Sequence, residues 1–122
     1  MNLISKIRNL IKSEKFVEVD FTDAKTIENL NGLQTITSKS ILSGKGNVNL
    51  HLEQNVSIEI LGEYSGKISA SKDSYIKLVG AFTGRIQVEL LDINSSGHFN
   101  GELEIDKIRV QPGAKMNTEI NS

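Results

Sequence analysis

The sequence predicts a single-domain, all-β solenoid of about five to six rungs. Three observations predict it. A glycine–aromatic–glycine unit recurs at a short interval, apolar and polar residues alternate around each copy, and 122 residues with one proline and no cysteine suit one β domain.

The repeated unit starts at Gly62, and its next two copies follow after 18 and 17 residues. An earlier copy without the aromatic begins at Gly46, and a degenerate copy opens at Gly113. A period this short and regular is typical of stacked rungs, whose terminal copies are often atypical. The repeat residues are Gly62, Tyr64 and Gly66; Gly80, Phe82 and Gly84; and Gly97, Phe99 and Gly101.

Alternation with a period of two runs through the copies. Even positions from Ile76 to Leu90 are apolar or glycine, and most odd positions between them are polar. This pattern predicts strands with one buried face. The parity changes near Leu91-Asp92 and at Asp106-Lys107, and we interpret these points as corners of the rungs.

The aromatic residues of the repeat fall on the buried parity. With rungs about 4.8 Å apart, Tyr64, Phe82 and Phe99 should form an internal ladder, and the flanking glycines should leave room for the rings. We therefore expect them to fill the core rather than to bind a ligand.

The first sixteen residues differ from the rest, because they carry four basic side chains and one acidic one, whereas residues 17–122 sum to −4. Their apolar residues form one stripe of a short amphipathic helix. Two interpretations stay open: the helix lies in an anionic membrane interface, or it caps the first rung. The membrane-binding candidates are Leu3, Ile4, Lys6, Ile7, Arg8, Leu10, Ile11 and Lys12.

We therefore divide the chain into a targeting or capping segment, 1–16, and a β-helical polymerisation domain, 17–122. Val17 to Ser43 is less regular than the later repeats, although Val17, Val19 and Phe21 alternate like a first strand. This stretch should form the first one or two rungs.

The sequence offers no constellation for catalysis. His51 and His98 take the outward parity, and neither has a neighbouring nucleophile or a carboxylate at a spacing typical of a catalytic site. No phosphate-binding loop, calcium nonapeptide or cysteine is present. We expect no enzyme activity, cofactor or metal, and the net charge of −1 disfavours nucleic-acid binding.

The repeats resemble those of the bactofilins, the bacterial polymer-forming cytoskeletal proteins. The resemblance rests on Gly80 to Ile86, Gly97 to Leu103 and Ile108 to Ala114. It implies a right-handed triangular β-helix that assembles end to end without nucleotide or metal. It also implies a cytoplasmic scaffold for cell shape or client proteins, bound to the inner face of the cytoplasmic membrane through a short N-terminal segment. The chain departs from the family in lacking proline-rich tails and in its irregular early rungs.

An uncovered last rung would be an assembly site, because an apolar cross-section and a free strand edge favour docking on another copy. We expect this interface at Val110, Met116 and Ile120, which makes the chain its own principal partner. The alternatives are a β-helical adaptor that does not polymerise and a left-handed β-helix acyltransferase. The acyltransferase is disfavoured because the apolar period is two rather than six.

Overall fold

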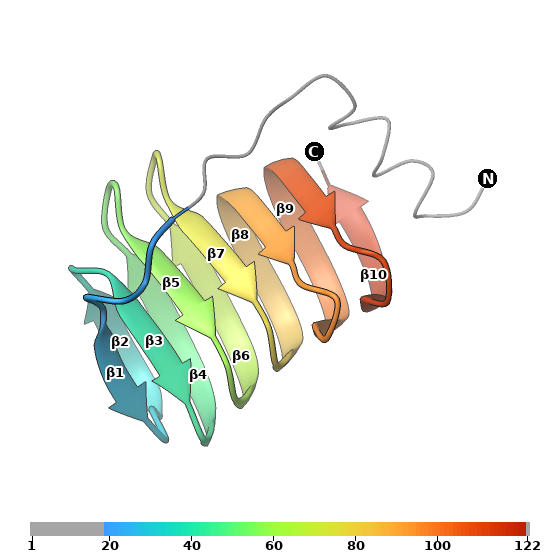
Figure 1. Ribbon diagram of the computed structural model, residues 1–122. Coiled ribbons are helices and arrows are strands. Elements are labelled where there is room, and N and C mark those ends of the chain that lie inside the picture. Colours follow the sequence, from blue (N-terminus) through green and yellow to red (C-terminus); the bar gives the residue numbers. More distant parts are fainter. Residues whose placement is uncertain (1–18, 122) are drawn as a thin grey trace.

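The computed structural model describes residues 19–121, with side chains described up to Thr118. These residues form an all-β solenoid of about 6 turns, in which every strand pair is parallel (Figure 1). The prediction of an all-β solenoid is confirmed. The segment predicted to be an amphipathic helix, residues 1–16, lies outside the described residues.

Each of the first four turns combines a short strand with a longer one, and the last two turns are built from the last three strands. The short strands are β1 (Lys25–Glu28), β3 (Ser40–Ser43), β5 (Ser57–Ile60) and β7 (Tyr75–Leu78). The others are β2 (Gly32–Ile36), β4 (Lys45–Leu52), β6 (Glu63–Ala70), β8 (Ala81–Ile93), β9 (His98–Val110) and β10 (Lys115–Asn121).

The two longest strands pass around a corner of the solenoid. In β8, residues 81–87 pair with β6, and residues 90–93 then pair with β7. Buried positions change parity across this bend, from Val88 to Leu91, and β9 repeats the change between Ile105 and Ile108. The corner in β9 lies where the sequence predicts it, and the corner in β8 begins a few residues earlier than predicted.

A further corner divides the longer strands in two, at the stacked residues Gly66, Gly84 and Gly101. Their φ angles are +120°, +138° and +143°. A Cβ on Gly84 would lie 2.0 Å from the carbonyl oxygen of Gly66, and one on Gly101 would lie 1.8 Å from that of Gly84. The neighbouring rung's backbone therefore requires these glycines, and the expectation that they make room for aromatic rings is wrong at this corner.

The solenoid consequently has three sides. The short face is the outer surface of β1, β3, β5, β7 and the C-terminal parts of β8 and β9. The second side carries outward residues before the glycine corner, such as Thr83, and the third side carries those after it, such as Gln87.

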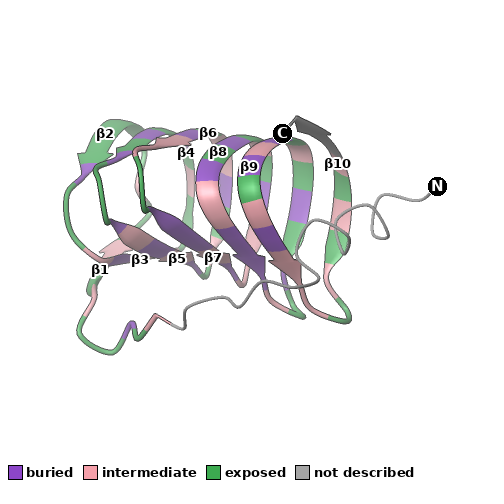
Figure 2. Cartoon of the chain, turned by 90° about the horizontal axis from the view of Figure 1, so that it is seen from above, coloured by how far each residue is buried: buried purple, intermediate pink, exposed green. Residues whose placement is uncertain are grey.

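The core is a continuous column of inward-facing side chains. Figure 2 shows the buried residues as regular bands along the strands. Tyr64, Phe82 and Phe99 occupy matching positions in successive rungs and are at most 3% exposed. The rings of Phe82 and Phe99 stack with centroids 6.2 Å apart. The Tyr64 ring extends over Gly46, and its hydroxyl donates to the carbonyl oxygen of Ser43.

The irregular early stretch forms the first turn, β1 and β2, and leads into β3. The described part of the proposed first strand is not a strand. Residues 19–24, hereafter the arm, instead contain a turn in which the Ala24 amide donates to the Phe21 carbonyl oxygen at 3.1 Å.

Candidate assembly surfaces

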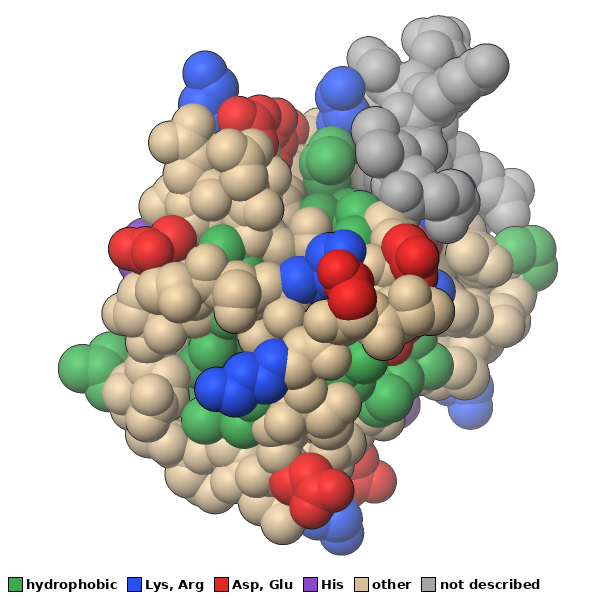
Figure 3. Space-filling view, turned by 60° about the vertical axis from the view of Figure 1, so that its left-hand side comes forward, with side chains coloured by type: hydrophobic (Ala, Val, Ile, Leu, Met, Phe, Trp, Pro, Cys, Tyr) green, Lys and Arg blue, Asp and Glu red, His purple; other side chains and the backbone are tan. Residues whose placement is uncertain are grey.

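The N-terminal end of the solenoid is an open rung. Among the described strands, β1 pairs only with β3, and β2 pairs only with β4. Leu33 of β2 is 78% exposed, while Ile27 and Leu30 pack on the core but remain partly exposed. Figure 3 brings this end forward and shows hydrophobic side chains at the surface between polar and charged ones.

The C-terminal end is open in the same way. Of the described strands, only β9 pairs with β10, and the last short segment, residues 107–110, pairs only with β8. Val110, Ala114 and Met116 pack on the core and are only partly buried. Two of the three predicted interface residues thus lie at this end. The third, Ile120, pairs through its backbone with Leu103, and its side chain lies outside the described residues.

Within residues 19–121, both ends therefore combine unpaired backbone groups with an incompletely covered apolar cross-section. Unpaired edges are templates for another strand. Parallel rungs on a second copy could continue the hydrogen-bond ladder at either end, and such contacts generate open filaments.

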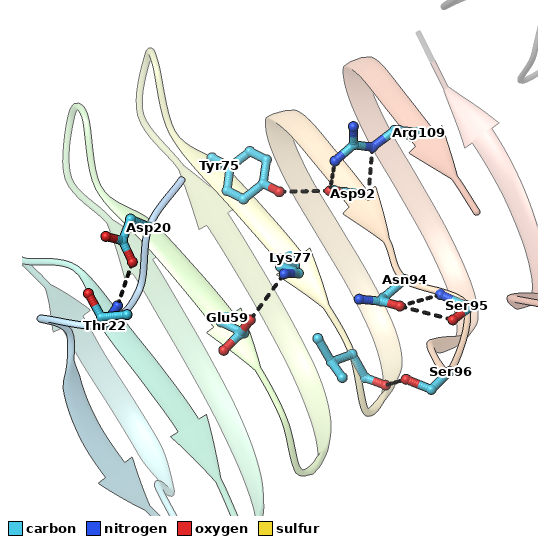
Figure 4. A network of polar contacts seen from close by, with 11 residues as sticks. Asp20, Thr22, Glu59, Tyr75, Lys77, Asp92, Asn94, Ser95, Ser96 and Arg109 are labelled. Carbon is cyan, nitrogen blue, oxygen red and sulfur yellow. Dashed lines mark hydrogen bonds and ion pairs between the residues drawn. The ribbon is translucent and has the colours of Figure 1, made fainter. Parts of the chain in front are cut away.

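The short face carries a ladder of alternating charges. Glu59, Lys77, Asp92 and Arg109 occupy one outward position in four successive rungs. Lys77 Nζ lies 3.5 Å from Glu59 Oε2, and the Arg109 guanidinium makes two hydrogen bonds to the Asp92 carboxylate (Figure 4). Each carboxylate of the ladder is thus paired with a cation in an adjacent rung.

Asp92 is the most buried member of this ladder. It is 0% exposed, although its position points away from the core. Besides Arg109, it accepts a hydrogen bond of 2.8 Å from the Tyr75 hydroxyl. Sequence reasoning missed this cluster, because it assigned Asp92 only to a change of parity interpreted as a corner. The available signal was the 17-residue separation of Asp92 and Arg109, which equals one rung in this part of the chain; Tyr75 lies two residues before Lys77, the residue that pairs with Asp92.

Replacing Asp92 with asparagine should destabilise the protein by about 2 kcal/mol, because it removes charge from hydrogen bonds that are worth more when one partner is ionised. The Arg109 side chain is 29% exposed, so it can recover part of its hydration. Urea denaturation of both proteins would measure the difference. Glu102→Gln, which alters an exposed pair on the third side, is the control and should change stability by less than about 0.5 kcal/mol. Equal effects would contradict a special role for Asp92.

The arm packs against the outer surface of the solenoid. The Phe21 ring lies 6.4 Å from that of Tyr75, and Lys39 Nζ donates to the Asp20 carbonyl oxygen at 2.6 Å. Within the arm, the Thr22 amide donates to the Asp20 carboxylate, and this bond holds the pKa of Asp20 below its usual value. The arm is thus anchored by an aromatic contact and by a lysine.

The two histidines are exposed on the outer surface. No nucleophile lies near His51 in the sequence, but the structure places Ser69 Oγ 3.3 Å from its Nδ1 and Ser71 Oγ 3.2 Å from its Nε2. These serines come from the next rung, which linear spacing obscures. Serines contact both ring nitrogens, so neither nitrogen has the orienting carboxylate of a hydrolase triad.

The remaining sequence predictions concern membrane binding and metal ions. The candidate membrane-binding residues between Leu3 and Lys12 lie outside the described residues. Within residues 19–121, no helix is long and apolar enough to cross a membrane, and no group of three or more histidine, cysteine or acidic residues is arranged to hold a metal ion.

The geometry of residues 19–121 defines a class of protein, the parallel β-solenoid. The family model for bactofilins, described as polymer-forming cytoskeletal, matches residues 26–121. The chain belongs to the bactofilin family. No curated protein and no solved structure matches the chain.

Proposed function

We propose that this protein assembles end to end into nucleotide-independent filaments that act as a scaffold on the inner face of the cytoplasmic membrane. The observation that carries the proposal is that, among residues 19–121, each end of the solenoid has strands paired on one side only and an apolar cross-section that is partly exposed. Membership of a polymer-forming cytoskeletal family supports the same function.

In this proposal the protein is a structural element and not an enzyme. Its chemistry is self-association, with no cofactor, metal or nucleic acid required. Clients would bind along the filament. Membrane attachment would come from the basic, amphipathic segment at 1–16, whose binding is strengthened when a polymer presents many copies.

High-speed sedimentation tests the proposal directly. The purified protein should pellet without nucleotide, and electron microscopy of the pellet should show filaments. Floating the sample with anionic vesicles should carry it upward with the lipid. A protein that stays in the supernatant as a monomer would contradict the filament and favour an adaptor that does not polymerise.

Deleting residues 2–12 should abolish flotation with vesicles and leave filaments intact, because the strands that form both ends are retained. Replacing Lys6, Arg8 and Lys12 with glutamine removes the positive charge of the segment but keeps its length, so the same assay distinguishes the two contributions. Loss of filaments together with flotation would instead favour the capping interpretation of this segment.

A further inference from the structure

The arm runs along the solenoid axis. Phe21 contacts Tyr75 at the start of β7, in the fourth turn, whereas Lys25 begins β1 in the first turn. The four residues after Phe21 therefore lead back across the outside of the intervening rungs. Figure 2 shows the arm on the outer side of the row formed by β1, β3, β5 and β7.

The contact between Phe21 and Tyr75 is separate from the core. Both side chains are buried, at 8% and 3% exposure, yet neither belongs to the continuous cluster of core residues. Their burial therefore fixes the arm on the short face rather than completing a rung. As a result, the arm lies on the side of the solenoid and not over its first rung.

We propose that the short face is the side of the solenoid that faces an anionic lipid bilayer. This inference rests on the proposed membrane association. The arm places the attachment point of the basic segment on this face, while both ends stay available for other copies. If rungs continue in register through a filament, the short faces form one side, and every copy presents its basic segment toward the same surface.

The carboxylates of the strands differ between the sides, although the arm adds Asp23 to the short face, where it pairs with Lys39 and is 78% exposed. On the short face, Glu59 is paired with Lys77, and Asp92 is buried against Arg109 and Tyr75. On the third side, Glu102 and Glu104 share one cation, Arg85, at 3.4 Å each, and their side chains are 55% and 46% exposed. Anionic headgroups would be repelled more strongly by the exposed carboxylates of the third side.

Because the chain contains no cysteine, single cysteines can report on each side. We would compare Ile41→Cys on the short face, Thr83→Cys on the second side and Gln87→Cys on the third. Each rate of labelling by a polyethylene-glycol maleimide is measured with and without vesicles of phosphatidylglycerol and phosphatidylcholine. For each variant, the labelling rate with vesicles is divided by the rate without them. This ratio cancels differences in intrinsic exposure between the sites and any protection that filament formation alone provides.

The proposal expects vesicles to suppress labelling at Ile41→Cys and to leave the other two rates unchanged. Suppression at Thr83→Cys or Gln87→Cys, or equal suppression at all three, would overturn it. Failure of the proposed membrane association can be distinguished from failure of the orientation, because in the first case the protein would not float with vesicles at all.

The arm itself is tested with Phe21→Ala. This variant should still float with vesicles, because residues 1–16 are intact, but it should lose the preferential protection of Ile41→Cys. Leu61→Ala, which truncates a half-exposed leucine outside the arm, is the control and should retain it. Preserved selectivity in Phe21→Ala would show that the arm does not orient the solenoid.

Discussion

Replacing Gly84 with alanine is expected to destabilise the solenoid by more than about 4 kcal/mol, the range of the most damaging single substitutions. The added Cβ would lie 2.0 Å from the carbonyl oxygen of Gly66. Relief of this clash requires movement of one rung's backbone away from the next, and the same strands carry the parallel hydrogen bonds between β6 and β8. The positive φ of +138° adds backbone strain.

Gly32→Ala is the matched control, because it separates the clash from the strain. Gly32 also has a positive φ, +88°, but no atom lies within 4 Å of the position that an added Cβ would occupy. It should cost about 1–2 kcal/mol, the ordinary penalty of a left-handed backbone. Urea denaturation followed by circular dichroism would compare the two. Similar losses would show that rung-to-rung contact is not what requires glycine at this corner.

The repeat in the sequence identifies the fold because a solenoid repeats its environment. Tyr64, Phe82 and Phe99 occupy the same core position in successive rungs. The same packing requirement therefore selects an aromatic residue at three regularly spaced positions of the sequence. The glycines recur just as regularly in the sequence, but the sequence does not show why glycine is required. A sequence shows that position 84 is glycine, whereas only the structure shows the carbonyl oxygen that excludes a side chain there.

The arm and the buried cluster on the short face were harder to foresee. Phe21 falls in an alternating pattern with Val19, which favours a strand, but its ring packs outside the rungs against Tyr75. Asp92 has outward parity, yet Tyr75 and Arg109 enclose it. Both features depend on contacts between rungs, which a local pattern does not encode.

Met116→Arg is expected to abolish filaments and leave a folded, soluble protein. Met116 lies on β10 in register with Phe99, packs on the core and is only partly covered. In a filament built through this end, the end rung of another copy, whether its first or its last, would cover it. An arginine there would bring an unpaired charge into an apolar contact, which proteins avoid because desolvation of a charge is costly. Sedimentation and electron microscopy measure the loss of filaments, and circular dichroism measures the retained β structure.

Asn117→Arg is the control that distinguishes the effect of position from the effect of the added charge. Asn117 is the next residue on the same strand and is exposed on the outer surface. It adds the same arginine beside the interface rather than within it, so its filaments should persist. If Met116→Arg also forms normal filaments, the C-terminal end is not an obligatory contact. Persistence of filaments in Leu33→Arg at the opposite end as well would show that the subunits assemble side to side rather than end to end.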